Sequence, residues 1–245
     1  MRTKKTGSGL YTLILIALLT LTSCARHYEM EEEPQEISMP EPVVEKAPVQ
    51  PVVKPKPFIR KTIVIDSGHG GKDCGTSSGQ FKYQEKKLTL QTANLIRSYL
   101  EKKGYNVIMT RHRDEFVSLE KRVSIANQAS SHLFVSMHYN YADNTKAQGI
   151  EVHYFDAKQH PQKAIASKKL AQTILGEVIH FTGAKSRGIK NSNLVVIRKT
   201  DMAAVLVEGG FLSNPQERQK LKDHRYLEAL AWGVACGIDN YLKAL

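Results

Sequence analysis

The sequence predicts an α/β fold for the part of the chain that follows residue 58. Short apolar runs rich in β-branched residues, which are typical of buried strands, alternate there with segments whose apolar residues recur at helical spacing. Strands that alternate with helices favour a central sheet covered by helices. Hydrophobic residues make up 41% of the 245 residues, which suits a globular protein and excludes a membrane protein with several spans.

The first 23 residues are predicted to be a bacterial lipoprotein signal peptide. A positively charged start precedes an apolar run from Leu10 to Leu21, which is too short to cross a bilayer comfortably. The run ends in Leu-Thr-Ser-Cys24, which resembles the lipobox, where small residues precede a cysteine that receives a diacylglycerol. The alternative is an apolar N-terminus with a chance cysteine. We expect Cys24 to be lipidated and to hold the protein on a membrane.

Residues 24–58 are predicted to form an extended tether. Seven of the nine prolines of the chain lie here, together with three consecutive glutamates at 31–33. Such a composition cannot bury enough apolar surface to pack a core. At roughly 3 Å per residue, the tether would let a folded domain at 59–245 reach on the order of 100 Å from its anchor.

Six runs within residues 59–245 are predicted to be strands, because each is short, apolar and bounded by polar or turn residues. They are Thr62–Asp66, Asn106–Thr110, Leu133–His138, Gly149–Phe155, Leu194–Arg198 and Ala204–Glu208. Four helices are predicted from apolar stripes and from a serine in the N-cap position at 118. They cover Leu88–Leu100, Leu119–Asn127, Lys163–Phe181 and Leu227–Leu242.

Four side chains that bind metals or protons are predicted to meet at one edge of this sheet. His69, His138 and Glu208 follow or end predicted strands, and Glu85 precedes the first helical stripe. In α/β sheets, ligands gather at the carboxyl ends of strands. Zinc takes imidazole nitrogen and carboxylate oxygen, and a catalytic zinc site uses three protein ligands, which leaves a second carboxylate as general base.

Each of these residues also has an ordinary structural explanation. His69 lies in a glycine-rich loop of the kind that binds phosphate, although the phosphate-loop pattern is missing. His138 fits a hydrogen-bonded core histidine, and Glu85 fits a first-turn acid favoured by the helix dipole. Glu208 is harder to explain, because a carboxylate on a buried strand must be paired or functional. The combination of the four favours a metal site.

Eight motifs resemble the zinc-dependent N-acetylmuramoyl-L-alanine amidases of bacterial cell walls. They occur in the family's order and cover essentially the whole predicted domain. They are Ile63-Val-Ile-Asp-Ser-Gly-His-Gly-Gly71, Gln84-Glu-Lys86, Thr110-Arg111 with Asp114, Leu119 with Arg122 and Ala126-Asn127, Phe134-Val-Ser-Met-His-Tyr-Asn140, Gly149-Ile-Glu-Val152, Arg187-Gly-Ile189 and Val205-Leu-Val-Glu-Gly-Gly-Phe-Leu-Ser-Asn214.

The resemblance implies one zinc ion held by His69, Glu85 and His138, with Glu208 as the catalytic carboxylate. It also implies a mixed, mostly parallel six-stranded sheet with helices on both faces. The implied substrate is peptidoglycan, cut between N-acetylmuramic acid and the L-alanine of the stem peptide during wall remodelling and daughter-cell separation.

Three further residues are assigned roles at this site. We expect Asn140 and Arg187 to contact the substrate. Asp66, three residues before His69, is expected to orient a ligand histidine, with a role in the turn after its strand as the alternative.

The chain departs from the family pattern at a few positions. Ser67, Cys74 and Ala203 stand where the family usually has proline, which changes loop stiffness; Cys74 also offers a thiolate as an alternative zinc ligand. Some family members carry a helical insert that plugs the site until a partner withdraws it. The link from Asp156 to Gln162 is too short for such a plug, so we expect a monomer that needs no activator.

The charge and the remaining cysteines limit the partners. A net charge of +11 suits an acidic glycopeptide or anionic headgroups, and no nucleic-acid-binding motif accompanies it, so nucleic acid is not expected. We expect a periplasmic protein anchored in a membrane, with the outer membrane favoured over the inner. Cys74 and Cys236 are either two small buried side chains or a disulfide.

Two rival functions are open. Ser118-Leu-Glu-Lys121 fits the pattern of penicillin-sensitive serine carboxypeptidases, in which a serine nucleophile and a lysine base share a helix face. The partner motifs of that class are absent from the predicted domain, and Ser118 is equally suited to cap a helix. The other rival is a wall-binding lipoprotein without activity, which the presence of Glu208 disfavours.

Overall fold

The computed structural model describes residues 60–76, 84–156 and 159–245, which belong to one compact unit. The predicted signal peptide, the tether and Cys24 lie outside these residues. None of the described helices is long and apolar enough to cross a membrane.

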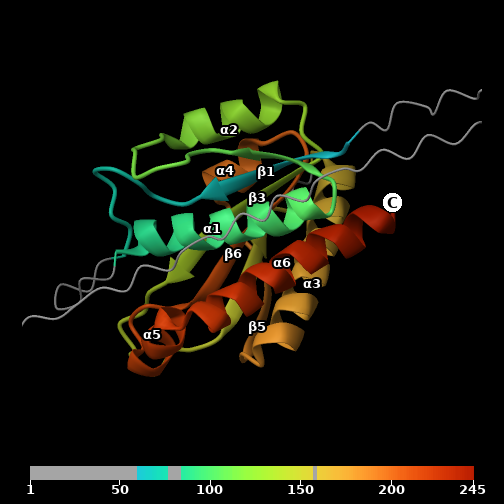
Figure 1. Ribbon diagram of the computed structural model, residues 1–245. Helices are drawn as coiled ribbons and strands as arrows, with labels where there is room; N and C mark the ends of the chain where they lie inside the picture. Colours follow the sequence, from blue (N-terminus) through green and yellow to red (C-terminus); the bar gives the residue numbers. More distant parts are fainter. Residues whose placement is uncertain (1–59, 77–83, 157–158) are drawn as a thin grey trace, which may run out of the picture. The chain divides into compact units, whose positions relative to one another are not determined.

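A six-stranded sheet forms the centre of the unit, in the order β2-β1-β3-β6-β4-β5 (Figure 1). The first four strands in this order are parallel, and β4 and β5 run together in the opposite direction, so the single antiparallel pair is β4 with β6. The predicted mixed, mostly parallel sheet of six strands is confirmed. The strands are β1 Thr62–Ser67, β2 Asn106–Met109, β3 Leu133–Asn140, β4 Ile150–Tyr154, β5 Ser186–Asn191 and β6 Ala203–Phe211.

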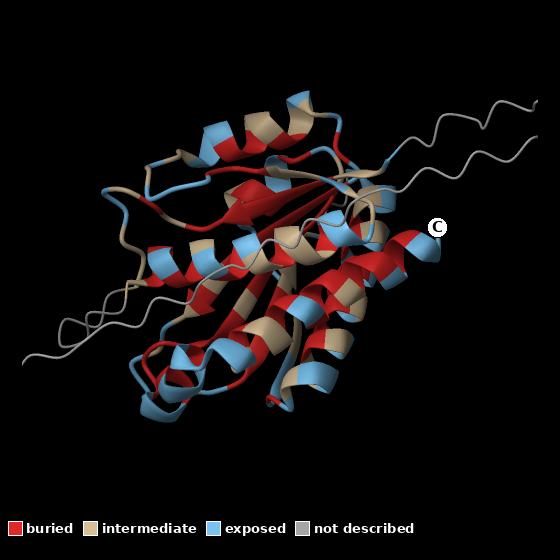
Figure 2. Cartoon of the chain, viewed as in Figure 1, coloured by how far each residue is buried: buried red, intermediate tan, exposed pale blue. Residues whose placement is uncertain are grey.

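Helices cover both faces of the sheet, and most of the sheet is buried between them (Figures 1 and 2). The helices are α1 Glu85–Lys102, α2 Leu119–Gln128, α3 Pro161–Thr182, α4 Val195–Lys199, α5 Pro215–Lys222 and α6 His224–Lys243. The long helices α1, α3 and α6 pack on one face, and α2 and α4 pack on the other.

Side-chain alternation along the strands assigns the two faces. On β1, Ile63 and Ile65 join the large core under α1, α3 and α6, whereas Val64 joins a smaller core under α2 and α4. Successive side chains of a strand point to opposite faces, so a strand buried on both sides is apolar throughout. The small core is the important one for function, because α2 and α4 are short and its side of the sheet carries the polar side chains described below.

One predicted strand is wrong, and one strand was not predicted. The run at 194–198 is not a strand: Val195–Lys199 forms α4, whose Val196 and Ile197 are buried against the sheet. The sixth strand is β5, a mostly polar segment in which only Ile189 packs against the core. Periodicity cannot separate a five-residue helix from a strand, and an edge strand needs few apolar residues because little of it is buried.

The predicted helix starts and ends agree with the structure to within a few residues. Ser118 is the N-cap of α2, and its Oγ accepts a hydrogen bond from the backbone N–H of Lys121 at 3.2 Å. A hydroxyl in this position satisfies one of the free donors of the first turn. The capping role proposed for Ser118 is therefore present, and no contact between its hydroxyl and the Lys121 ammonium occurs in the described part of the chain.

Asp239 joins α6 to the end of α1 and the start of β2. Its buried carboxylate accepts hydrogen bonds from Lys103 and Lys243, both at 2.9 Å, and from the Tyr105 hydroxyl at 2.8 Å. Burial opposes ionisation, but these three donors outweigh it and lower the pKa of Asp239 from 3.8 to about 2.

We expect Asp239→Asn to lower the free energy of unfolding by about 2 kcal/mol at neutral pH. Because the folded-state pKa of Asp239 is the lower one, its contribution is present above pH 3.8 and is lost as the pH falls toward 2. Urea denaturation at several pH values measures the difference. Glu101→Gln, which removes an exposed pair with Arg97, is the control and should cost under ~0.5 kcal/mol; a pH-independent difference for Asp239→Asn would contradict this assignment.

Candidate active site

Chemically active side chains converge at the edge of the sheet where the parallel strands end. β1 ends just before His69, β3 carries His138, and β6 carries Glu208 directly beside His138 in the strand register. β4 runs the other way, so its beginning lies at this same edge, where Glu151 pairs with Glu208. Topology thus brings together four side chains that are far apart in the sequence.

His69, Glu85 and His138 form a compact group of possible metal ligands. The carboxylate Oε1 of Glu85 lies 3.1 Å from Nε2 of His69 and 3.0 Å from Nδ1 of His138, and one ligand atom from each residue lies within 4.8 Å of the others. The backbone N–H of Tyr139 also donates to Glu85 Oε1 at 3.0 Å. The two nitrogens and one oxygen are a donor set that zinc accepts.

Close packing leaves no room for variation around these ligands. A Cβ on Gly68 would lie 2.3 Å from the His138 ring, and a Cβ on Gly75 would lie 2.5 Å from the Glu85 carboxylate. His69 itself has a φ of 59°, in the left-handed region that non-glycine residues seldom adopt. Strained backbone of this kind is kept where surrounding structure holds it and occurs often at functional sites.

Two buried arginines hold the loop that carries His69. Arg122 donates to the backbone oxygens of Ser67 at 2.6 Å and His69 at 2.7 Å. Arg111 donates to Ser67 at 3.0 Å and to Gly68 at 2.8 Å. These backbone oxygens would otherwise be buried without partners, so the arginines stabilise the loop in this one conformation.

The predicted role of Asp66 is not the one that the structure shows. Its buried carboxylate accepts hydrogen bonds from Thr110, Ser136 and Arg122, at 2.6, 2.6 and 2.5 Å. These donors occupy both carboxylate oxygens, and the place of Asp66 on β1 directs it under α2 instead of toward the His69 ring. Asp66 therefore anchors Arg122, and only through Arg122 does it support the loop.

Asp73 contacts the His69 ring instead. Its Oδ2 lies 2.9 Å from Nδ1 of His69, the ring nitrogen opposite the one that faces Glu85. A carboxylate in this position fixes the tautomer and the orientation of a ligand histidine. The sequence contained part of the signal, because Asp73 is four residues from His69 in a glycine-rich segment; the backbone pairing of Gly70 with Asp73 became visible only in the structure.

Glu208 is half-buried, and its Oε2 atom is buried without a hydrogen-bond partner among the described residues. Burial, followed by the negative charges of Glu85 and Glu151, raises the pKa of Glu208 well above its usual range. A buried carboxyl group left unsatisfied is costly, and such groups are found where they serve a reaction. Its neighbours in the register are His138 and Glu151, so it lies next to the ligand group.

Glu151 accepts hydrogen bonds from the two residues that were expected to contact substrate. Asn140 Nδ2 donates to its Oε1 at 2.9 Å, and Arg187 Nε donates to its Oε2 at 2.9 Å. Nε2 of His153 also lies 3.3 Å from Oε1. The sequence analysis quoted Glu151 within a motif but gave it no role, although an acid between two apolar residues of a strand is the same signal that singled out Glu208.

A groove of about 490 Å³ opens beside the ligand group. His69, Asp73 and His138 line it, and its walls come from the loop before α2 and the segment that enters α4. Those walls carry three exposed apolar side chains, Phe116 and Leu119 on one side and Leu194 on the other. Exposed apolar residues gathered along one groove indicate a binding surface.

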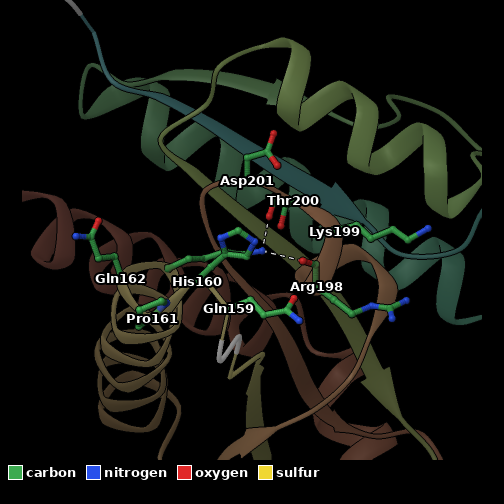
Figure 3. A pocket seen from close by; sticks show the side chains of 9 residues that line it. Gln159, His160, Pro161, Gln162, Arg198, Lys199, Thr200 and Asp201 are labelled. Atoms are coloured by element: carbon green, nitrogen blue, oxygen red, sulfur yellow. Dashed lines mark hydrogen bonds between the residues drawn. The ribbon is translucent and has the colours of Figure 1, made fainter.

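A second cavity, with a volume of about 790 Å³, lies elsewhere, between the start of α3 and the end of α4 (Figure 3). The Lys163 ammonium, which lines it, donates to the backbone oxygens of Ile197, Arg198 and Thr200. Arg198 and Lys199 extend away from His160 in Figure 3. The cavity contains none of the expected site residues, and its lysine caps the end of α4.

Cys74 and Cys236, for which the sequence allowed either two buried side chains or a disulfide, are free thiols in the described part of the chain. The disulfide is therefore not formed in this structure. Cys74 does not belong to the group of possible metal ligands, which consists of His69, Glu85 and His138.

Comparison with known proteins gives a consistent result. The model of the N-acetylmuramoyl-L-alanine amidase family matches residues 63–240. The probable cell wall amidase LytH of Staphylococcus epidermidis is 34% identical over 198 residues, which cover 80% of this chain and 64% of the relative. The chain thus spans a little under two thirds of that relative's length.

Solved structures of similar sequence have the same fold. An N-acetylmuramoyl-L-alanine amidase from Clostridium difficile 630 is 37% identical with a TM-score of 0.71, over 76% of this chain and 98% of that one. The CwlD amidase from Clostridioides difficile, solved in complex with the GerS lipoprotein, is 30% identical with a TM-score of 0.71, over 76% of this chain and all of that one.

Proposed function

Because the chain belongs to the N-acetylmuramoyl-L-alanine amidase family, we propose that it is a peptidoglycan hydrolase that cuts the amide bond between N-acetylmuramic acid and the L-alanine of the stem peptide. One observation carries the proposal: Glu208, whose Oε2 is buried and has no partner among the described residues, lies beside the group formed by His69, Glu85 and His138. A metal-binding group next to a proton acceptor is an arrangement that can hydrolyse an unactivated amide.

Zinc fits the three ligands. His69, Glu85 and His138 supply two imidazole nitrogens and one carboxylate oxygen, and both imidazoles already face the same carboxylate oxygen. Three protein ligands are the number that leaves a position for reactant in catalytic zinc sites. When bound, zinc supplies a Lewis acid for the amide carbonyl and lowers the pKa of water at the site toward ~7.

The residues of the chain then perform the proton transfers. Glu208 accepts the proton of the attacking water and returns it to the alanine nitrogen as the amide bond breaks. Its raised pKa suits the first of these steps, because a carboxylate of ordinary pKa is a weak base toward water. A cation held by Glu85 would lower the pKa of Glu208, whereas the charges of Glu85 and Glu151 raise it. Asp73 keeps the His69 ring in place throughout.

The test is incubation of the purified full-length protein with a defined muropeptide, followed by mass spectrometry of the products. We expect the intact stem peptide and the free glycan, and we expect both to disappear with a zinc chelator and to return with added zinc. Release of D-alanine alone, insensitive to chelator and dependent on Ser118, would favour the serine carboxypeptidase. No product under any condition would favour the wall-binding protein.

Asp73→Asn is expected to weaken zinc binding roughly 10-fold, because the amide orients the His69 ring less well than a carboxylate. Competition with a calibrated chelator measures the affinity. Asp114→Asn is the matched control: Asp114 is equally exposed and bonds the same loop through Gly71, but it does not touch His69. Equal losses in the two variants would show that loop stability, and not ring orientation, sets the affinity.

We further propose that the protein is a periplasmic lipoprotein that acts in wall remodelling and cell separation, anchored at Cys24 in the outer membrane and held to its catalytic domain by the tether at 24–58. Multiple acyl chains on one cysteine give stable membrane attachment. Cys24→Ala is expected to abolish incorporation of labelled fatty acid and to leave the protein in the soluble fraction with its activity intact. Label that still incorporates into the variant would refute the anchor.

Activity without a partner protein is also part of the proposal. β4 ends at Tyr154 and α3 begins at Pro161, so the connection at 155–160 is short. A connection of this length has no room for a helix that plugs the active site, so a monomer needs no partner protein to withdraw one. CwlD was solved with a lipoprotein partner, so the rate of the purified protein on sacculi should be compared with and without envelope extract; a large stimulation by a protease-sensitive component would contradict unaided activity.

A further inference from the structure

Arg187 is held in place by one edge of its guanidinium group. Its Nε donates to Glu151 at 2.9 Å, and the guanidinium carbon lies 4.8 Å from the centre of the Phe211 ring, so the ring covers one face of the group. Glu151 in turn accepts hydrogen bonds from Asn140 and lies within reach of His153. This support fixes the position and the plane of the Arg187 side chain, of which 36% remains exposed.

The other edge of the guanidinium group is available for a ligand. The two terminal nitrogens of Arg187 have no hydrogen-bond partner among the described residues, and together they form a fork that matches a carboxylate. An arginine whose Nε is used for positioning and whose terminal pair faces solvent is preorganised to bind an anion, because little conformational entropy is lost on binding.

The fork lies close to the bond that is to be cut. Glu151 and Glu208 are direct neighbours across β4 and β6, so their Cα atoms are about 5 Å apart and the guanidinium lies within roughly 10 Å of the catalytic carboxyl. In a stem peptide, the residue after the L-alanine is a D-glutamyl residue whose α-carboxyl group is either free or amidated. One residue spans about 4 Å along a chain and a hydrogen bond adds about 3 Å at each end, so this group can reach Arg187 while the scissile amide is at Glu208.

The opposite side of the site has a largely apolar surface, although the Lys72 ammonium lies over the Phe116 ring there. There the groove is walled by Phe116, Leu119 and Leu194, whose exposed surfaces are apolar. The charged part of the substrate therefore has its complement on the β4–β5 side, and the less polar part has its complement on the α2–α4 side.

We propose that Arg187 is a specificity residue that binds the free α-carboxylate of the second stem residue, so that this chain cleaves non-amidated stem peptides in preference to amidated ones. The inference rests on the proposed amidase function and adds the substrate class to it.

The experiment uses two muropeptides that differ only in a carboxylate or a carboxamide at the second residue, with the full-length zinc-loaded protein. We expect kcat/KM to favour the carboxylate about 10- to 100-fold, the ratio that hydrogen bonds to a charged group supply, mostly through KM. Arg187→Gln should reduce the ratio to within about 3-fold of unity, by loss of activity on the carboxylate substrate only. Arg187→Lys should retain part of the preference, because a lysine keeps the charge but lacks the fork.

Lys190→Gln is the matched control, since Lys190 lies on the same strand and the substitution removes the same charge. The control should keep the wild-type ratio; an equal fall in Lys190→Gln would show a general charge effect and would overturn the assignment to Arg187. A wild-type ratio near unity would also overturn it. Calorimetry with the dipeptides L-alanyl-D-glutamate and L-alanyl-D-isoglutamine separates this proposal from the amidase function. If the protein shows no turnover but still binds L-alanyl-D-glutamate more tightly, and Arg187→Gln removes that difference, the amidase function is refuted and the carboxylate site is retained.

Discussion

Replacing Glu208 with glutamine is expected to lower turnover at least ~100-fold while zinc and the fold remain. The amide has the shape of the carboxyl group but cannot accept the proton of the attacking water, and general base catalysis contributes roughly 10²–10⁴-fold. The substitution also removes an acid with a buried Oε2, whose ionisation is opposed by desolvation and then by the charges of Glu85 and Glu151. The melting temperature should therefore stay the same or rise, because an unpaired buried charge is more costly than an amide.

Three measurements check this expectation: turnover of a defined muropeptide, zinc content by elemental analysis, and the melting temperature. Glu120→Gln is the control, because Glu120 lines the same groove but is exposed, and it should change turnover less than ~3-fold. Near-normal turnover in Glu208→Gln would remove Glu208 from the mechanism. A large loss accompanied by loss of zinc would instead make Glu208 part of the metal site.

His69→Ala and His138→Ala are each expected to abolish stoichiometric zinc and, with it, activity. Two remaining ligands cannot hold the ion in a catalytic geometry, since affinity depends on the full set of ligands and their orientation. Each substitution also removes one of the two imidazoles that face Oε1 of Glu85, which leaves this buried carboxylate with less compensation.

The measurement is the zinc content after dialysis against a weak chelator, with circular dichroism to show that the fold persists. His112→Ala is the control, because His112 is exposed in the connection between β2 and α2 and should keep one zinc ion. Retention of one zinc ion by either ligand variant would show that the assignment of ligands is incorrect. Activity that survives without zinc would refute the metal-dependent mechanism itself.

The sequence by itself determined the class of fold and most of the reactive residues. Buried strands must be apolar on both faces, so β1, β3 and β6 were visible as short runs, and a carboxylate or histidine that interrupts or ends such a run stands out as unexplained. That is why His138 and Glu208 could be selected before any contact was known. The N-cap at Ser118 was equally local, because a cap depends on a single turn of helix.

Only the tertiary structure decided which of these side chains act on one another. Asp66 and Asp73 are about equally distant from His69 in sequence, and the pleat of β1 sends Asp66 beneath α2 while the glycine turn brings Asp73 to the imidazole. The residues of α4 and of the polar strand β5 show no periodicity that separates a helix from a strand. Packing against the rest of the molecule decided that the first is a helix and the second a strand. Arg187 and Glu151 meet because β5 adds to the edge of β4, and such long-range pairing depends on the whole sheet, not on the residues near either position.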